Sequence, residues 1–209
     1  MVHTAQFTKT LPNWLLAKKE EIQTEVIRKA IHMMAAFVPA LHRINPVFTI
    51  GLLTTCSILY TYIEISRLSG RNFSFITNIL YAASRKKDYG KATLGPITLA
   101  FGIIISLILF QQPVSDIAIY ALAFGDGLAS LAGKMFGRVK IPYSGGKTIA
   151  GSTACLIAVF IVSYRTTNRI GVSIILAFFT MLVEVLPSGD LDNIILPVCT
   201  GYFVLVLQV

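Results

Sequence analysis

The chain alternates long apolar stretches with short polar connections. Runs of about the 20 residues that cross a bilayer as a helix lie at 26–44, 47–66, 93–110, 114–133, 149–164, 170–186 and 193–209. They are continuous and lack the period of two that a membrane-facing strand requires, which favours helices over a barrel. The pattern predicts an all-α polytopic membrane protein with about seven transmembrane helices. The fifth run is short and the fourth contains Asp126, so six or seven full spans are expected.

Composition supports a membrane protein, because 55% of the 209 residues are hydrophobic and only 13% are charged, which is too apolar for a soluble domain. The first 25 residues are more polar, and the part from Leu11 to Glu25 is expected to form an amphipathic helix in the membrane interface. The chain therefore divides into an N-terminal interfacial segment, 1–25, and a single transmembrane domain, 26–209, which holds the candidate catalytic groups.

Positive charge gathers on one side of this topology. When the seven runs are laid alternately across a membrane, only Arg43, Arg165 and Arg169 of the 18 Lys and Arg residues fall on the side away from the N-terminus. Cytoplasmic loops are enriched in Lys and Arg, so we expect the N-terminus inside and the C-terminus outside. The net charge of +8 then indicates anionic lipid headgroups or a nucleotide as partners, and no nucleic acid. The outward connections are predicted to be plain connectors.

Two sets of polar residues follow helical spacing on the inward side. Glu25, Arg28, Lys29 and His32 lie on one face of the first predicted helix. A snorkelling anchor at the headgroups is the alternative reading, but His32 lies a turn deeper than Arg28 and needs a polar partner, which favours the wall of a site.

The second set begins at Asp126, a costly residue inside a membrane helix, which stands between two glycines. Asp126, Ser130 and Lys134 recur at i, i+4 and i+8 and so share one face. This face presents an acid, a hydroxyl and an ammonium group in order of decreasing depth. An interhelical Asp–Lys pair without any chemistry is the alternative.

A glycine-rich basic turn, Gly145-Gly146-Lys147-Thr148, opens the next predicted helix, and Gly151-Ser152 follow on its first turn. It is not a Walker A loop, because Ile141 stands where the first glycine belongs and no strand precedes it. Its glycines would still let backbone amides converge on an anion, while the helix N-terminus and Lys147 add positive charge. A purely structural glycine turn is the alternative.

Acidic residues are scarce, with ten in the chain, yet Glu184, Asp190 and Asp192 stand close together beside Asn193. With Asp126 they are candidates to hold Mg²⁺, which takes one or two carboxylates together with substrate phosphates. Alternatively, Asp190 or Asp192 caps the last predicted helix.

Taken together, these motifs resemble the membrane family of CTP-dependent lipid kinases, which comprises dolichol kinase, phytol kinase and CTP-dependent diacylglycerol or polyprenol kinases and is related to phosphatidate cytidylyltransferases. The matching pieces span 25–197 and are Arg28-Lys29 with His32, Tyr89-Gly90-Lys91 with Gly95-Pro96, Gly125-Asp126 through Ser130 to Gly133-Lys134 and Gly137, Gly146-Lys147-Thr148 with Gly151-Ser152, and Glu184 through Pro187 to Asp192-Asn193 and Pro197.

The resemblance implies transfer of the CTP γ-phosphate to the hydroxyl of a membrane lipid alcohol at the cytoplasmic face, with Mg²⁺ as cofactor and a place in lipid or phospholipid biosynthesis. The expected catalytic residues are Arg28, Lys29, Asp126, Lys147 and Asp192. The expected nucleotide- and phosphate-binding residues are His32, Ser130, Lys134, Gly145, Gly146, Lys147, Thr148, Gly151 and Ser152. The expected metal ligands are Asp126, Glu184, Asp190 and Asp192. Asp126 is also the first candidate to orient or deprotonate the lipid hydroxyl.

Two other functions use similar residues. A phosphatidate cytidylyltransferase would make a CDP-lipid. The last motif of this chain, at 188–193, departs from that family because no His-Gly-Gly precedes it and it has no Asp-Arg pair. An anionic metabolite transporter would place its site near the midplane between repeats, and no internal repeat is evident. The expected partners are the bilayer, a lipid alcohol and CTP, and a homo-oligomer is left open. The choice of CTP over ATP comes from the resemblance alone.

Overall fold

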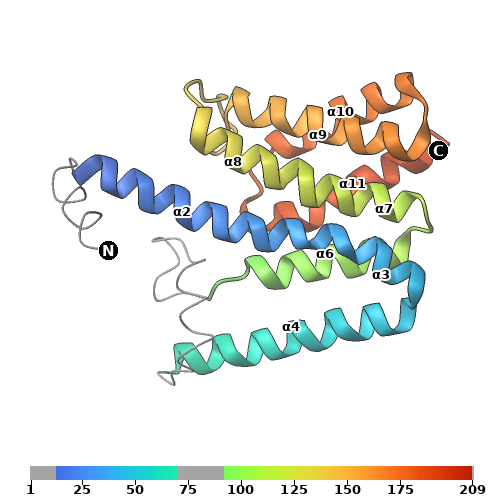
Figure 1. The fold of residues 1–209 in the computed structure, drawn as a ribbon, viewed down its shortest axis with the longest axis horizontal. Helices are drawn as coiled ribbons and strands as arrows, with labels where there is room; N and C mark the ends of the chain where they lie inside the picture. The colour runs from blue at the N-terminus through green and yellow to red at the C-terminus, as the bar shows by residue number, and fades with distance from the viewer. Residues whose placement is uncertain (1–12, 70–91, 209) are drawn as a thin grey trace, which may run out of the picture.

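The computed structural model describes residues 13–69 and 92–208, and this part of the chain is a helical bundle without a named strand (Figure 1). Its elements are α2 (Asn13–Met33), η2 (Met34–Phe37), α3 (Val38–Ile44), α4 (Pro46–Leu68), α6 (Gly95–Leu109), α7 (Val114–Tyr120), the π-helix η4 (Ala121–Asp126), α8 (Gly127–Phe136), α9 (Ile149–Thr167), α10 (Ile170–Val185), η5 (Gly189–Leu191) and α11 (Asp192–Val206). The all-α prediction is confirmed.

Local sequence signals set several helix boundaries. The Asn45 side chain accepts a hydrogen bond from the Phe48 amide at 3.0 Å, and Pro46 takes the first position of α4, where its missing N–H costs nothing. Thr148 caps α9 in the same way through the Gly151 amide. Asn168 ends α9 in the left-handed conformation with φ 54°, which asparagine tolerates better than most residues.

The continuous run of α7, η4 and α8 forms the centre of the bundle, and most of it is buried. Helix α9 packs against α8 and α10, α11 packs against α6 and α7, and α2 lies along α8 (Figure 1). Ile117, Ile119 and Leu122 of the central run are fully buried, as are Leu176 of α10 and Leu196 of α11. Helix α4 lies at one edge, where it contacts α3 and α6.

Polarity is distributed in the reverse of a soluble domain. Charged groups such as Glu25, Lys29 and Asp116 are buried, while large apolar side chains such as Phe37 and Val47 are exposed. Broad exposed apolar surfaces mark contact with a partner or with lipid. An apolar exterior around a charged interior fits a protein surrounded by hydrocarbon.

The seven expected spans are confirmed only in part. Four stretches are long and apolar enough to cross a membrane within the described residues, namely Pro46–Leu68, Val114–Phe136, Ile149–Thr167 and Gly189–Val206, and Gly95–Leu109 and Ile170–Val185 are apolar but shorter. The expected span 26–44 is not among them. There α2 runs without a break from Asn13 to Met33, so the polar stripe and the first part of the expected span share one helix. Residues 1–12 of the expected interfacial segment lie outside the described residues.

We predict that Gly102→Ala destabilises the fold. A methyl group at Gly102 of α6 would meet the Asn193 carbonyl oxygen of α11 at 1.9 Å, and this backbone contact cannot move aside. Forcing the two helices apart should cost about 1–3 kcal/mol, visible as a lower thermal midpoint in detergent. The matched control is Gly51→Ala in α4, where nothing lies within 4 Å and added helix propensity should be neutral or stabilising. Equal midpoints for the two variants would contradict the tight α6–α11 contact.

Candidate functional site

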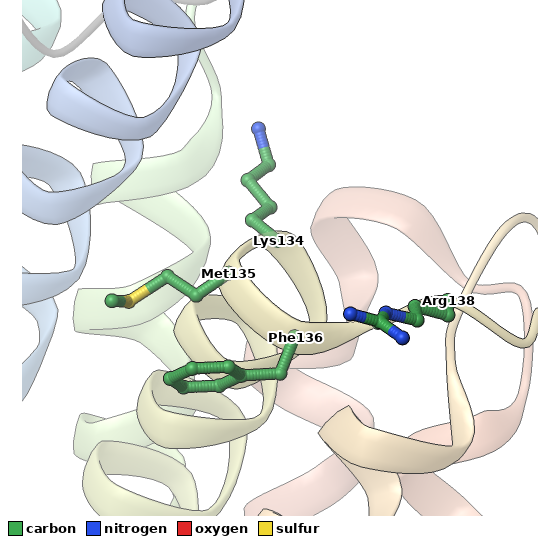
Figure 2. Close-up of a pocket in the computed structure, with 5 residues that line it drawn as sticks. Lys134, Met135, Phe136 and Arg138 are labelled. Carbon is green, nitrogen blue, oxygen red and sulfur yellow. The ribbon is translucent and has the colours of Figure 1, made fainter.

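One end of the bundle gathers the polar groups, and an open pocket of about 430 Å³ lies there at the end of α8. Lys134, Met135, Phe136, Gly137 and Arg138 line this pocket. Figure 2 shows Met135 and Phe136 projecting to one side of the chain and Arg138 to the other. The buried charged groups lie deeper in the bundle, and Lys134 belongs to both places because it also pairs with Glu25.

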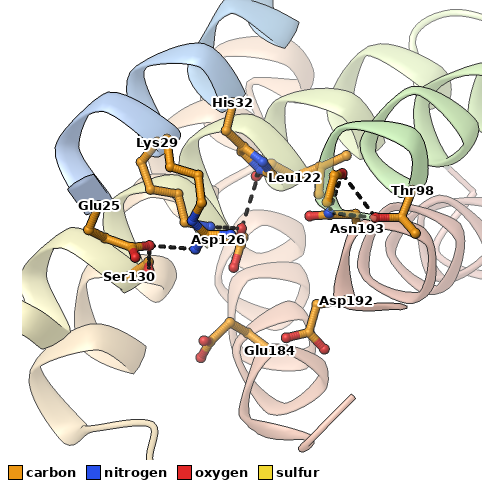
Figure 3. A network of polar contacts seen from close by, with 12 residues as sticks. Glu25, Lys29, His32, Thr98, Leu122, Asp126, Ser130, Glu184, Asp192 and Asn193 are labelled. Atoms are coloured by element: carbon orange, nitrogen blue, oxygen red, sulfur yellow. Dashed lines mark hydrogen bonds and ion pairs between the residues drawn. The ribbon is translucent and has the colours of Figure 1, made fainter. Parts of the chain in front are cut away.

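Asp126 lies at the centre of the buried charges, where α2 meets the central run (Figure 3). The ammonium group of Lys29 donates a short hydrogen bond to Asp126 Oδ2, and His32 Nε2 lies 3.3 Å from the same oxygen. His32 Nε2 also lies 3.0 Å from the carbonyl oxygen of Leu122. Asp126 ends the π-helix η4, a distortion frequent at functional sites because it redirects the side chains that follow.

Glu25 connects the two polar stripes of the sequence. Its carboxylate is fully buried, accepts hydrogen bonds from Arg28 and from Ser130 Oγ, both at 2.5 Å, and lies 3.3 Å from Lys134 Nζ. The predicted face of Asp126, Ser130 and Lys134 therefore packs against the predicted face of α2. The sequence placed Glu25 in its stripe but gave it no role, because the partners on α8 are more than 100 residues away.

A second charged group surrounds Lys147. Its ammonium group donates to Asp192 Oδ2 at 2.9 Å, lies 3.2 Å from Glu184 Oε1 and also donates to the Glu184 carbonyl oxygen. Ser152 donates to the other carboxylate oxygen of Glu184 at 3.3 Å. Figure 3 shows the carboxylates of Glu184 and Asp192 facing the same space below Asp126.

The two groups belong to one electrostatic site. Asp126 acts through space on Lys147, Glu184 and Asp192. Burial by itself lowers the pKa of Lys147, but the neighbouring carboxylates of Glu184 and Asp192 outweigh it, and the pKa of Lys147 is raised above its ordinary value of 10.5. Lys147 is therefore a full cation at neutral pH.

The glycine-rich turn has the backbone that its sequence requires, since Gly145 and Gly146 have φ values of 70° and 99°, a region that favours glycine. Two neighbouring residues have structural roles. The Thr148 hydroxyl caps α9 by accepting from the Gly151 amide at 3.2 Å. Gly151 lets α9 approach α8, because a Cβ there would lie 2.7 Å from the Ala129 carbonyl oxygen. The expected phosphate contacts at 148 and 151 thus fall on residues already used in packing and capping.

The remaining expected residues do not join either charged group. No described residue forms a hydrogen bond or ion pair with Asp190, whereas the amide of Asn193 donates to Thr98 Oγ1 at 2.9 Å and to the Gly95 carbonyl oxygen at 3.2 Å. Asn193 therefore ties α11 to the start of α6. The expected motif at 89–91 lies outside the described residues.

The opposite end of the bundle holds a further ion pair beside one of its connections. Asp116, next to the connection 111–115, is fully buried and forms a short ion pair with Arg43. Its other carboxylate oxygen has no hydrogen-bond partner among the residues that the structure describes. The sequence reasoning overlooked this pair, because the two residues were considered separately on connections far apart in the chain.

The donor set suits a metal only together with a substrate. Among the described residues, no group of three or more His, Cys, Asp and Glu side chains is placed to hold a metal ion. Glu184 and Asp192, however, flank one cation, the Lys147 ammonium group, at 3.2 and 2.9 Å. Two carboxylates around one cation are what Mg²⁺ uses when phosphates supply its remaining ligands.

No family model and no solved structure matches this chain. Comparison with curated proteins does find relatives. The chain is 26% identical over 151 residues to a probable phytol kinase 1, chloroplastic, of Glycine max, which covers 64% of this chain and 50% of that protein. It is 24% identical over 211 residues to phytol kinase 1, chloroplastic, of Arabidopsis thaliana, covering 88% and 67%. A probable phytol kinase 3 of Glycine max is 39% identical over 82 residues, 26% of its length. The chain thus spans about half the length of the first of these relatives.

We predict that Lys147 stabilises the fold up to strongly alkaline pH. Because the folded-state pKa lies above 10.5, its contribution is fully present below pH 10.5 and is lost as the pH rises through the folded-state value. Lys147→Met should lower the free energy of unfolding by about 3 kcal/mol, since it leaves two carboxylates without their cation. The measurement is the difference in thermal midpoint between the wild type and Lys147→Met across this range. A difference that vanishes already at neutral pH would contradict the ion-pair geometry.

Proposed function

We propose that this chain is a lipid kinase that transfers the γ-phosphate of CTP to the hydroxyl of a membrane lipid alcohol of the phytol, polyprenol or diacylglycerol class. The observation that carries the proposal is that two groups of charges, one around Asp126 and one around Lys147, lie at one end of an apolar helical bundle. The relatives named phytol kinase support the reaction class. The donor CTP follows from the motif resemblance.

Phosphoryl transfer asks a protein mainly for positioning and charge neutralisation. Arg28, Lys134 and Lys147 supply positive charge, and their side chains keep exposed fractions of 26, 25 and 21%. They are therefore accessible to phosphate oxygens, unlike the buried Lys29. Each now pairs with a carboxylate, so phosphate oxygens would replace carboxylate oxygens around cations that already have fixed positions.

Asp126 is the group we assign to the lipid hydroxyl. Lys29 and His32 both contact Asp126 Oδ2, which fixes the orientation of the carboxylate. An ionised, oriented carboxylate can accept a hydrogen bond or a proton from an attacking hydroxyl. Glu184 and Asp192 would hold Mg²⁺, which when bound neutralises charge on the phosphates.

The membrane arrangement is part of the proposal. We infer that α2 with α3, and the shorter α6 and α10, complete about seven membrane crossings with the charged end of the bundle at the cytoplasmic face. In support, Arg165 in the last turn of α9 and Arg169 just after it lie at the end of α9 opposite to Lys147, which precedes the start of this helix. The lipid would enter sideways, with its hydroxyl at the headgroup level and its tail along the exposed apolar helix faces.

The direct test supplies γ-labelled CTP or ATP with phytol, a polyprenol or diacylglycerol to the purified protein in lipid vesicles. We expect label in the lipid with CTP and at least a 100-fold loss of turnover in Asp126→Asn, because an amide cannot accept the proton. Asp116→Asn is the matched control, since Asp116 is also buried and paired with a cation, but at the other end of the bundle. Label in pyrophosphate would instead indicate a cytidylyltransferase, and full turnover in folded Asp126→Asn would remove that residue from the chemistry.

Glu25 should act as a positioning residue for the cations. In Glu25→Gln the neutral amide can still accept from Ser130 but no longer holds Arg28 and Lys134 by charge, so both lose a fixed direction. We expect the KM for the nucleotide to rise about tenfold with a smaller change in kcat, because phosphate binding rather than chemistry is affected. Glu64→Gln, which disturbs the similar Glu64–Arg67 pair on α4, should leave the KM unchanged. A fall in kcat alone would contradict this role.

A further inference from the structure

The segment that joins α8 to the glycine-rich turn carries an exposed surface of apolar and basic side chains. Its apolar members are Met135, Phe136, Val139 and Tyr143, with exposed fractions of 52, 68, 58 and 99%, and its exposed basic members are Arg138 and Lys140. We call these six residues the loop surface. The sequence contains no acidic residue between Asp126 and Glu184, so nothing in this stretch neutralises the two cations.

Tyr143 combines an exposed side chain with an unfavourable backbone conformation. It adopts φ 59°, a left-handed conformation that is unfavourable for a bulky residue, while its side chain is almost completely exposed. Strained backbone held in place by its surroundings is a feature of functional positions. Here the strain directs an aromatic ring outward, away from any packing within the described protein.

The loop surface is rigidly connected to the proposed phosphate-binding turn. The Ile141 amide donates to the Lys147 carbonyl oxygen at 2.8 Å, and the Ile149 amide donates to the Val139 carbonyl oxygen at 3.1 Å. An antiparallel bridge joins Lys140 to Thr148. The two arms of this narrow loop are therefore held together, with Val139 and Lys140 on one arm and Lys147 on the other.

We propose that the loop surface binds the headgroup layer of anionic phospholipids and thereby positions Lys147 and its turn for catalysis. The segment leaves one membrane-length stretch at Phe136 and enters the next at Ile149, so it lies at a membrane surface. Aromatic side chains favour that depth, and each basic residue gains free energy from anionic lipid. The pocket of about 430 Å³ between Lys134 and Arg138 (Figure 2) offers space for a headgroup phosphate. The catalytic consequence rests on the proposed function, whereas the lipid contact does not.

The test uses the full chain with its single tryptophan, Trp14, replaced by Trp14→Phe and a reporter introduced by Tyr143→Trp. The protein is placed in vesicles of phosphatidylcholine alone or mixed with phosphatidylglycerol. We expect phosphatidylglycerol to shift the reporter emission to shorter wavelength and to increase its quenching by lipids with brominated tails. In Arg138→Gln/Lys140→Gln this response should weaken about fivefold for each cation removed. Arg165→Gln/Arg169→Gln, which removes two cations at the other end of the bundle, should leave it unchanged.

Lipid kinase activity provides the second arm. We expect activity to rise severalfold with phosphatidylglycerol in the wild type, and the Lys140→Gln variant, whose cation lies outside the pocket lining, to lose part of this gain while its activity in phosphatidylcholine is unchanged. Emission that ignores phosphatidylglycerol, or that responds instead to CTP in neutral vesicles, would overturn the lipid contact. A normal emission response without any lipid phosphorylation would leave the contact in place and refute the proposed function. A normal response with activity insensitive to phosphatidylglycerol would overturn the positioning role alone.

Discussion

The ion pair between Lys29 and Asp126 is the contact on which the arrangement of this end of the molecule depends. An ionised group inside an apolar environment is tolerated only when it is paired, so Asp126 requires a cation within the bundle. Lys29 meets this need from a helix almost 100 residues earlier, and His32 contacts the same oxygen one turn deeper. The pairing holds α2 along α8, which in turn brings Glu25 within reach of Ser130 and Lys134.

Much of this end of the molecule followed from helical spacing. Glu25, Lys29 and His32 share one face of α2 because residues at i, i+4 and i+7 must do so, and Asp126, Ser130 and Lys134 share a face for the same reason. Each face carries charges that an apolar environment makes costly, which indicated that it needed a partner. The expected apolar runs 47–66, 93–110 and 149–164 were also close to α4, α6 and α9, because a long continuous apolar run favours a helix.

Other features could not be read from local patterns because they arise from long-range packing. The π-helix at 121–126 has no sequence signature of its own beyond the Gly125 and Gly127 that allow it. Lys147 contacts Glu184 and Asp192, which lie 37 and 45 residues later in the chain. Spacing in the sequence does not show that these residues are close in space. Gly151 belongs to a segment with the composition of a phosphate loop, yet its lack of a side chain allows α8 and α9 to approach closely. The pair of Arg43 and Asp116 shows the same limit at the opposite end.

The charge balance of the site argues for a divalent metal in the proposed reaction. Four carboxylates, those of Glu25, Asp126, Glu184 and Asp192, face four cations, those of Arg28, Lys29, Lys134 and Lys147. The described site is therefore close to neutral before any substrate binds. A nucleoside triphosphate would add several negative charges to a partly buried place, where an uncompensated charge is costly. Among these eight described groups no cation is in surplus, so we propose that further positive charge arrives with the nucleotide. In this proposal magnesium bound to the triphosphate would supply it, and Glu184 and Asp192 would be free to hold that ion if Lys147 paired with the phosphates instead.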